Sequence, residues 1–106
     1  MPELFVLEFE GFDKDDYGKV NSLLGIDMAT GAGDWPAGLL THSAGRTDKG
    51  WMVVEVWESR EAQDNFMKSR LGAALQQAGV DRPPTRADWT SLHAHHQPKR
   101  GAGVTG

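Results

Sequence analysis

Two short apolar segments of similar sequence, FVLEF at 5–9 and MVVEV at 52–56, constrain the fold most strongly. They stand 47 residues apart (52 minus 5), and the same shift matches Leu24 with Leu71. Each segment is followed by a stretch in which apolar residues recur at helical spacing. A strand–helix unit that occurs twice in one short chain predicts an internally symmetric α+β fold.

The remaining elements follow from periodicity and from residues that begin or end helices. Asp13 is a good N-cap and Gly25 a good helix stop, while Ser59 and Gly79 bracket a second helix in the same way. The predicted strands are 3–9, 38–44, 51–57 and 89–96, and the predicted helices are 13–25 and 59–79. This order predicts a ferredoxin-like βαββαβ fold, with a four-stranded antiparallel sheet and both helices on one face.

Length, charge and cysteine content limit the class of protein. At 106 residues the chain is expected to form one domain, at 1–96, followed by a flexible tail at 97–106. The net charge of −4 argues against a nucleic-acid partner or an anionic membrane surface, because both require a basic face. The absence of cysteine excludes disulfides and thiolate metal sites. No signal-peptide pattern and no run of ~20 apolar residues is present, so we expect a cytoplasmic protein.

Side-chain alternation along the strands assigns two faces to the predicted sheet. The face under the helices is expected to carry Phe5, Leu7, Phe9, Met52, Val54 and Val56. The opposite face is expected to carry Trp51, Trp57, Trp89, Glu8, Glu55, His42, His93 and His95. Three tryptophans on one uncovered face would form a large exposed apolar patch, which favours burial against a second copy of the chain. We therefore expect a homodimer in which two sheets form a barrel with an interior cavity.

The stretch GWMVVEVWESREAQDNFMKS at 50–69 resembles the dimeric α/β-barrel superfamily, and within it the antibiotic biosynthesis monooxygenase-like domains. The resemblance lies in a strand that ends in Trp-x-Ser and in the helix that follows it. It implies the same fold and a homodimer. Members of this superfamily include monooxygenases, haem-degrading enzymes, isomerases, cyclases and proteins of no known activity, so the resemblance leaves the function open.

The haem-degrading branch is disfavoured by the residues at its key positions. That branch uses an asparagine on the first strand and a tryptophan and a histidine on the second helix. The matching helix positions here are Phe66 and Gln76, and the first strand has no asparagine. Cavity histidines, which some isomerases and cyclases of the superfamily use, are present in this sequence.

Glu8 and Glu55 occupy equivalent positions of the repeat, on strands that neighbour each other in this fold. Two carboxylates on one buried face resist joint ionisation, so one of them would suit general acid or base chemistry. The alternative is that both are ordinary interface carboxylates.

The histidines offer a second set of candidates. His42 and His93 are expected to act as proton carriers with Glu55, with His95 nearby in the same cavity. Structural hydrogen bonding is an equally good interpretation. A metal site from two histidines and Glu55 is formally available, but residues two apart on a strand lie ~7 Å apart, which disfavours it.

The tryptophans and one long loop complete the candidate site. Trp51, Trp57 and Trp89 are expected either to form dimer core or to bind a flat aromatic ligand. The loop 26–38, with Trp35 as its lid residue, would close over that ligand. The favoured function is a cofactor-independent enzyme, monooxygenase-like or a proton-transfer isomerase or cyclase, that acts on an aromatic or polyketide-like molecule. The alternatives are a non-catalytic ligand-binding or structural homodimer and a metal-binding barrel.

Overall fold

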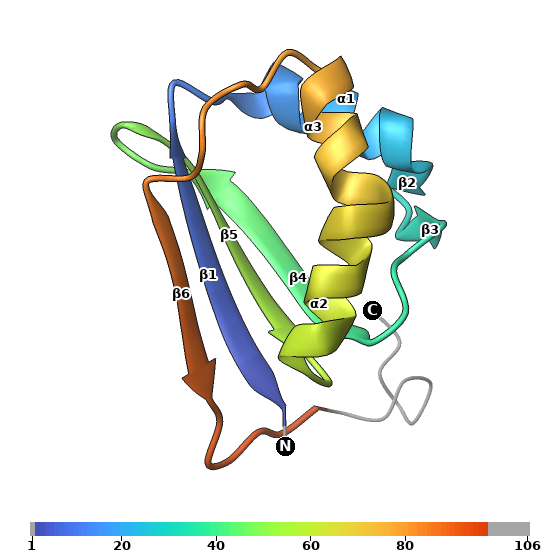
Figure 1. Ribbon diagram of the computed structural model, residues 1–106, viewed down its shortest axis with the longest axis vertical. Coiled ribbons are helices and arrows are strands. Elements are labelled where there is room, and N and C mark those ends of the chain that lie inside the picture. Colours follow the sequence, from blue (N-terminus) through green and yellow to red (C-terminus); the bar gives the residue numbers. More distant parts are fainter. Residues whose placement is uncertain (1, 98–106) are drawn as a thin grey trace.

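Four strands form one antiparallel sheet in the order β4-β5-β1-β6 in a computed structural model that describes residues 2–97 (Figure 1). Their bounds are β1 Glu3–Glu10, β4 Leu39–Arg46, β5 Gly50–Trp57 and β6 Arg86–Ser91. This strand order is consistent with the predicted ferredoxin-like α+β fold. β4 and β5 are joined by a turn in which the Thr47 amide donates to the Gly50 carbonyl at 2.9 Å.

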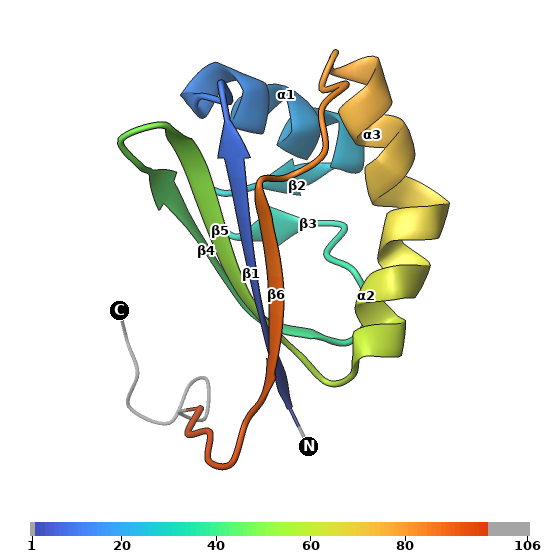
Figure 2. The same ribbon diagram turned by 60° about the vertical axis from the view of Figure 1, so that its left-hand side comes forward.

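The helices lie together on one face of the sheet (Figures 1 and 2). The first is α1, Lys14–Leu24, and the second helical segment runs without a break through α2, Arg60–Phe66, a π-helical turn η1, Met67–Leu71, and α3, Gly72–Gln77. Between α1 and β4 a small hairpin is formed by β2, Ile26–Asp27, and β3, Ala32–Gly33. No helix within residues 2–97 is long and apolar enough to cross a membrane.

The ends of the helices are where the capping residues predict them. Asp13 and Asp16 form a reciprocal capping box at the start of α1, and Gly25 ends that helix with φ 76°. Ser59 caps α2 by accepting a hydrogen bond from the Ala62 amide at 3.1 Å.

The predicted face of β5 is wrong. In the antiparallel register Phe5 pairs with Glu55, Leu7 with Val53 and Phe9 with Trp51, so each pair shares the helix-covered face. Trp51, Val53, Glu55 and Trp57 therefore point toward the helices, and Met52, Val54 and Val56 point away. The prediction chose Met52, Val54 and Val56 because this set is uniformly apolar, whereas the covered set includes the buried Glu55. A shift of one residue inverts the facing of every side chain.

The three strand tryptophans consequently belong to the core under the helices. Trp57 is fully buried, at 0% exposure, and its ring lies 5.9 Å from that of Phe66 on α2. Trp89 pairs with Phe5 across β6 and β1, and the two rings stack with centroids 4.1 Å apart. The expectation that Trp51, Trp57 and Trp89 form an exposed dimer face is therefore wrong.

The last strand is shorter than predicted and lies earlier in the sequence, at Arg86–Ser91 instead of 89–96. Ser91 pairs with Glu3, the first residue of β1, so residues after Ser91 have no β1 partner to extend the ladder. His93 and His95 thus lie beyond the sheet rather than on it. The predicted flexible tail at 97–106 falls, apart from residue 97, outside the described residues.

Candidate functional site

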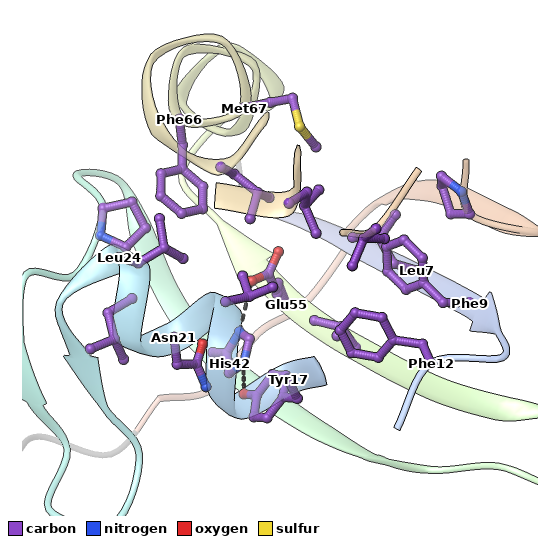
Figure 3. A pocket seen from close by; sticks show the side chains of 18 of the residues that line it. Leu7, Phe9, Phe12, Tyr17, Asn21, Leu24, His42, Glu55, Phe66 and Met67 are labelled. Carbon is purple, nitrogen blue, oxygen red and sulfur yellow. Dashed lines mark hydrogen bonds and ion pairs between the residues drawn. The ribbon is translucent and has the colours of Figure 1, made fainter. Parts of the chain in front are cut away.

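A cavity of about 230 Å³ lies between the sheet and the helices (Figure 3). Most of its wall is apolar, and every layer of the fold contributes to it. The apolar lining includes Leu7, Phe9, Phe12, Val20, Leu24, Leu39, Val53, Phe66, Met67 and Leu71. An engineered apolar cavity of ~150 Å³ is enough for benzene, so this volume suits a ligand of one or two fused rings.

One wall of the cavity is polar, and its centre is a cross-strand pair of β4 and β5. His42 lies directly opposite Glu55 in the register, and His42 Nδ1 is 2.7 Å from Glu55 Oε2. Both side chains are largely buried, at 12% and 10% exposure. The expectation that His42 shares a sheet face with Glu55 is confirmed, although that face is the one under the helices.

A β-bulge explains why the sequence pattern of β4 is weak. The register shifts between Leu39 and Thr41, so Leu39 and His42 both line the cavity although they are three residues apart. Without the extra residue, strict alternation would place them on opposite faces. The bulge therefore aims His42 into the cavity, as bulges near functional sites often do.

Glu55 is held by two donors. Its Oε2 faces His42 Nδ1, and its Oε1 accepts a hydrogen bond from Trp57 Nε1 at 3.0 Å. A carboxylate buried to this degree requires such partners, and accepting two N–H groups matches the ionised form. Trp57 thus supports the cavity wall through Glu55, although it does not itself line the cavity.

Tyr17 completes a chain of polar contacts. Its hydroxyl lies 2.5 Å from His42 Nε2, and the two rings are nearly parallel, with centroids 6.0 Å apart. In the simplest proton assignment, Tyr17 donates to His42 Nε2 and His42 Nδ1–H donates to Glu55. His42 is then a neutral imidazole with one donor and one acceptor nitrogen. Figure 3 shows His42 between Tyr17 and Glu55. We call Tyr17, His42 and Glu55 the polar relay.

The environment of Tyr17 keeps its phenol protonated. Burial raises the pKa of Tyr17, and the nearby Glu55 charge adds to this effect, while the adjacent Asn21 carboxamide opposes it. At neutral pH the hydroxyl is therefore a hydrogen-bond donor rather than a base.

The loop between α1 and β4 closes one side of the cavity. Trp35 lines it, with its ring 5.8 Å from that of His42, and Trp35 Nε1 donates to the Gly31 carbonyl at 2.9 Å. Arg70 holds this loop by donating to the Leu24 carbonyl at 2.9 Å and the Asp34 carbonyl at 2.6 Å. Among the residues expected to bind a ligand, Trp35 does lie at the cavity.

The π-helical turn shapes the opposite side. Within η1 the Gly72 amide donates to the Met67 carbonyl, one residue farther back than in an α-helix. Met67 and Leu71, the first and last residues of this turn, both line the cavity. Single π-turns inside α-helices occur frequently at functional sites.

Glu8 does not join the polar relay. It lies on the face of the sheet away from the helices, where its Oε2 accepts from Arg86 Nη1 at 3.2 Å. The expected pair of carboxylates on one face is therefore wrong, for the same reason as the facing of β5.

The C-terminal histidines also lie elsewhere. His93 and His95 are exposed, and His95 Nε2 is 3.3 Å from Gln97 Oε1 rather than near the relay. Their expected place in the cavity is wrong because β6 ends at Ser91. Among residues 2–97, no group of three or more His, Cys, Asp or Glu side chains is placed to hold a metal ion.

Two cavity residues, Tyr17 and Asn21, were not predicted from the sequence as site residues. Both lie on the face of α1 that turns toward the sheet, where the sequence pattern alone indicates an apolar stripe. A tyrosine and an asparagine spaced i, i+4 on a core-facing stripe were the available signal.

The chain matches no model of a known protein family, and no curated protein shows a significant similarity to it. The functional interpretation is accordingly based on the cavity and its polar relay.

Proposed function

We propose that the protein is a small cofactor-independent enzyme that transfers a proton within an aromatic or polyketide-like molecule bound in the sheet–helix cavity. The observation that carries the proposal is the polar relay, in which His42 is joined to Glu55 at 2.7 Å and to Tyr17 at 2.5 Å. An apolar cavity with a few convergent polar groups is the usual form of a small-molecule site.

In this proposal His42 Nε2 is the general base. A ligand carbonyl oxygen that approaches the Tyr17 hydroxyl draws its hydrogen bond away from Nε2, which frees the Nε2 lone pair. His42 then takes a proton from the carbon next to the carbonyl, and the electron pair of that C–H bond moves toward the oxygen. Return of the proton to another carbon completes an isomerisation, and the protein ends in its starting state.

The other two members of the relay support the charges that develop. Glu55 fixes the Nδ1–H tautomer and stabilises the imidazolium that forms on His42, as a buried carboxylate does in a catalytic triad. Tyr17 donates to the oxygen on which negative charge develops. Its pKa, raised by burial, keeps the hydroxyl protonated for this purpose.

The experiment is hydrogen–deuterium exchange of 2-tetralone, an enolisable two-ring ketone, followed by NMR in D2O. We expect the wild type to accelerate exchange over buffer by roughly 10²–10⁴-fold, the range of general base catalysis. His42→Ala should abolish the acceleration. His93→Ala is the matched control and should retain it, because His93 is exposed and lies outside the cavity. Equal rates in wild type and His42→Ala contradict the proposal.

A non-catalytic ligand-binding protein is the second candidate. It is favoured by the fact that both Glu55 oxygens already have protein partners, as in a purely structural polar network. Saturable binding of 2-tetralone without accelerated exchange would select this candidate.

We also propose that the chain forms a homodimer of the dimeric α/β-barrel type. The support is the helix-free face of the sheet, where β1 and β5 carry an apolar group and no helix packs (Figure 2). This apolar group, the open-face group, consists of Leu4, Val6, Met52 and Val54. A second copy of the same face would cover it with full self-complementarity.

A further inference from the structure

Asn21 lies on α1 one turn after Tyr17, and its side chain lines the cavity. Residues spaced i, i+4 on a helix share one face, so the carboxamide lies beside the Tyr17 hydroxyl. Figure 3 shows Asn21 next to His42 and Tyr17 at the polar end of the cavity. It is partly buried, and it has no part in the proton transfer described above.

The Asn21 side chain has unused hydrogen-bonding capacity. A carboxamide has two N–H donors and a carbonyl acceptor. It lies close enough to Tyr17 to oppose the rise of the Tyr17 pKa, and no hydrogen bond of normal geometry is formed by the Asn21 side chain within residues 2–97. Its neighbours in the cavity wall include the apolar Val20 and Leu24. A partly buried amide in such surroundings favours a polar partner in the cavity.

The surroundings of Asn21 favour a neutral partner, because Glu55 repels anions and the mostly apolar wall disfavours burial of any charged group. The carboxylate of Glu55 lies at the same end of the cavity, and it would repel an anionic ligand group. Arg82 is the one arginine among the described lining residues. Its guanidinium lies against Gly11, with Nη2 2.5 Å from the position that a Cβ would occupy there.

We propose that Asn21 is a specificity-determining residue that binds a hydroxyl or carbonyl oxygen of an uncharged ligand of one or two fused rings. The inference uses the cavity of the proposed function and names the group by which its ligand is recognised. Asn21 and the Tyr17 hydroxyl then hold the same oxygen atom from two sides, while the apolar wall receives the ring.

The test compares 2-naphthol with naphthalene, which lacks only the oxygen, by calorimetric or fluorescence titration. We expect the wild type to bind 2-naphthol about tenfold more tightly, since ~1.4 kcal/mol is the net gain of about one good hydrogen bond. Asn21→Leu, which keeps the size of the side chain and does not weaken the helix, should reduce this preference to about threefold or less while naphthalene binds equally or better. Asn21→Ala serves as a second variant of smaller volume.

Asn65→Leu is the matched control, because Asn65 lies on α2 and does not line this cavity. It should leave the preference for 2-naphthol unchanged. A preference that is the same in wild type and Asn21→Leu overturns the inference, as does tighter binding of 2-naphthoate than of 2-naphthol. Failure of the proposed function looks different: 2-naphthol still binds through Asn21, but 2-tetralone exchange is not accelerated.

Discussion

His42 and Glu55 face each other across β4 and β5 with Nδ1 and Oε2 2.7 Å apart, in the interior between sheet and helices. The two residues are 13 positions apart in the chain, on opposite strands of one hairpin. The hairpin register brings them together on one face of the sheet, and the bulge before His42 lets Leu39 face the same side. An acid–base pair is thereby built on rigid strands rather than on loops.

This pair should be energetically coupled. Glu55→Gln replaces one acceptor oxygen by an NH2 group, which then faces the N–H of either His42 or Trp57, so one bond is lost. We expect Glu55→Gln and His42→Phe each to reduce the free energy of unfolding by about 1–3 kcal/mol, the cost of an unsatisfied buried polar group. In the double variant the loss should be smaller than the sum by about 1–2 kcal/mol. Urea denaturation measures all four proteins, and strict additivity would refute the coupling.

The titration of Tyr17 can be followed without interference, because it is the single tyrosine in the chain. Burial and the Glu55 charge raise its pKa, so ultraviolet absorbance should give a midpoint above the ordinary value of about 10. The folded state thus favours the protonated phenol. This stabilisation is fully present below pH about 10 and is lost as pH rises through the folded pKa. Glu55→Gln should lower the midpoint, while His93→Ala should not; an unshifted midpoint in both would rule out the influence of the Glu55 charge on Tyr17.

The sequence predicts the elements of this fold well but the contents of the cavity poorly. The helix ends at Asp13, Gly25 and Ser59 depend on local capping interactions, which can be recognised directly in the sequence. The face of β5 depends on its register with β1, and a near-repeat such as FVLEF and MVVEV does not fix that register to one residue.

The same limit applies to the site. The sequence predicts His42 and Glu55 as partners, but it does not predict the bulge in β4, which weakens the alternation on which the assignment of faces depends. From the sequence alone Tyr17 is one more core residue of α1, and its contact with His42 follows only from the packing of the helix on the sheet. His93 was misplaced because the end of β6 is set by the start of β1, far away in the sequence.

Arg70 should control the loop that carries Trp35. Its guanidinium binds the carbonyls of Leu24 and Asp34, on both sides of the β2–β3 hairpin. The Asp34 N–H is bonded to the Gly25 carbonyl. Arg70→Gln should therefore speed amide hydrogen exchange at Asp34, by about tenfold for each 1.4 kcal/mol by which the free energy of local opening falls.

Arg60→Gln provides the matched control for this effect. Arg60 also joins distant elements, since its Nε donates to Glu3 at 2.8 Å and its guanidinium lies over the Trp89 ring, but it does not touch the loop. It should lower the melting temperature without changing exchange at Asp34. The role of Arg70 in holding the loop is disproved if both variants change the hydrogen-exchange rates of the loop amides to the same extent.

The open-face group should hold two copies of the chain together. Val54 lies at its centre, paired with Val6 on β1, and points away from the helices. Val54→Asp places a carboxylate on this surface, and two copies would then bury like charges against each other at a two-fold interface. We expect sedimentation velocity to show a dimer for the wild type and a folded monomer for Val54→Asp. Met28→Asp makes the same change at an exposed loop residue, 41% accessible, and should leave the dimer intact. A wild type that sediments as a monomer at high concentration would show that the open face has another occupant or none.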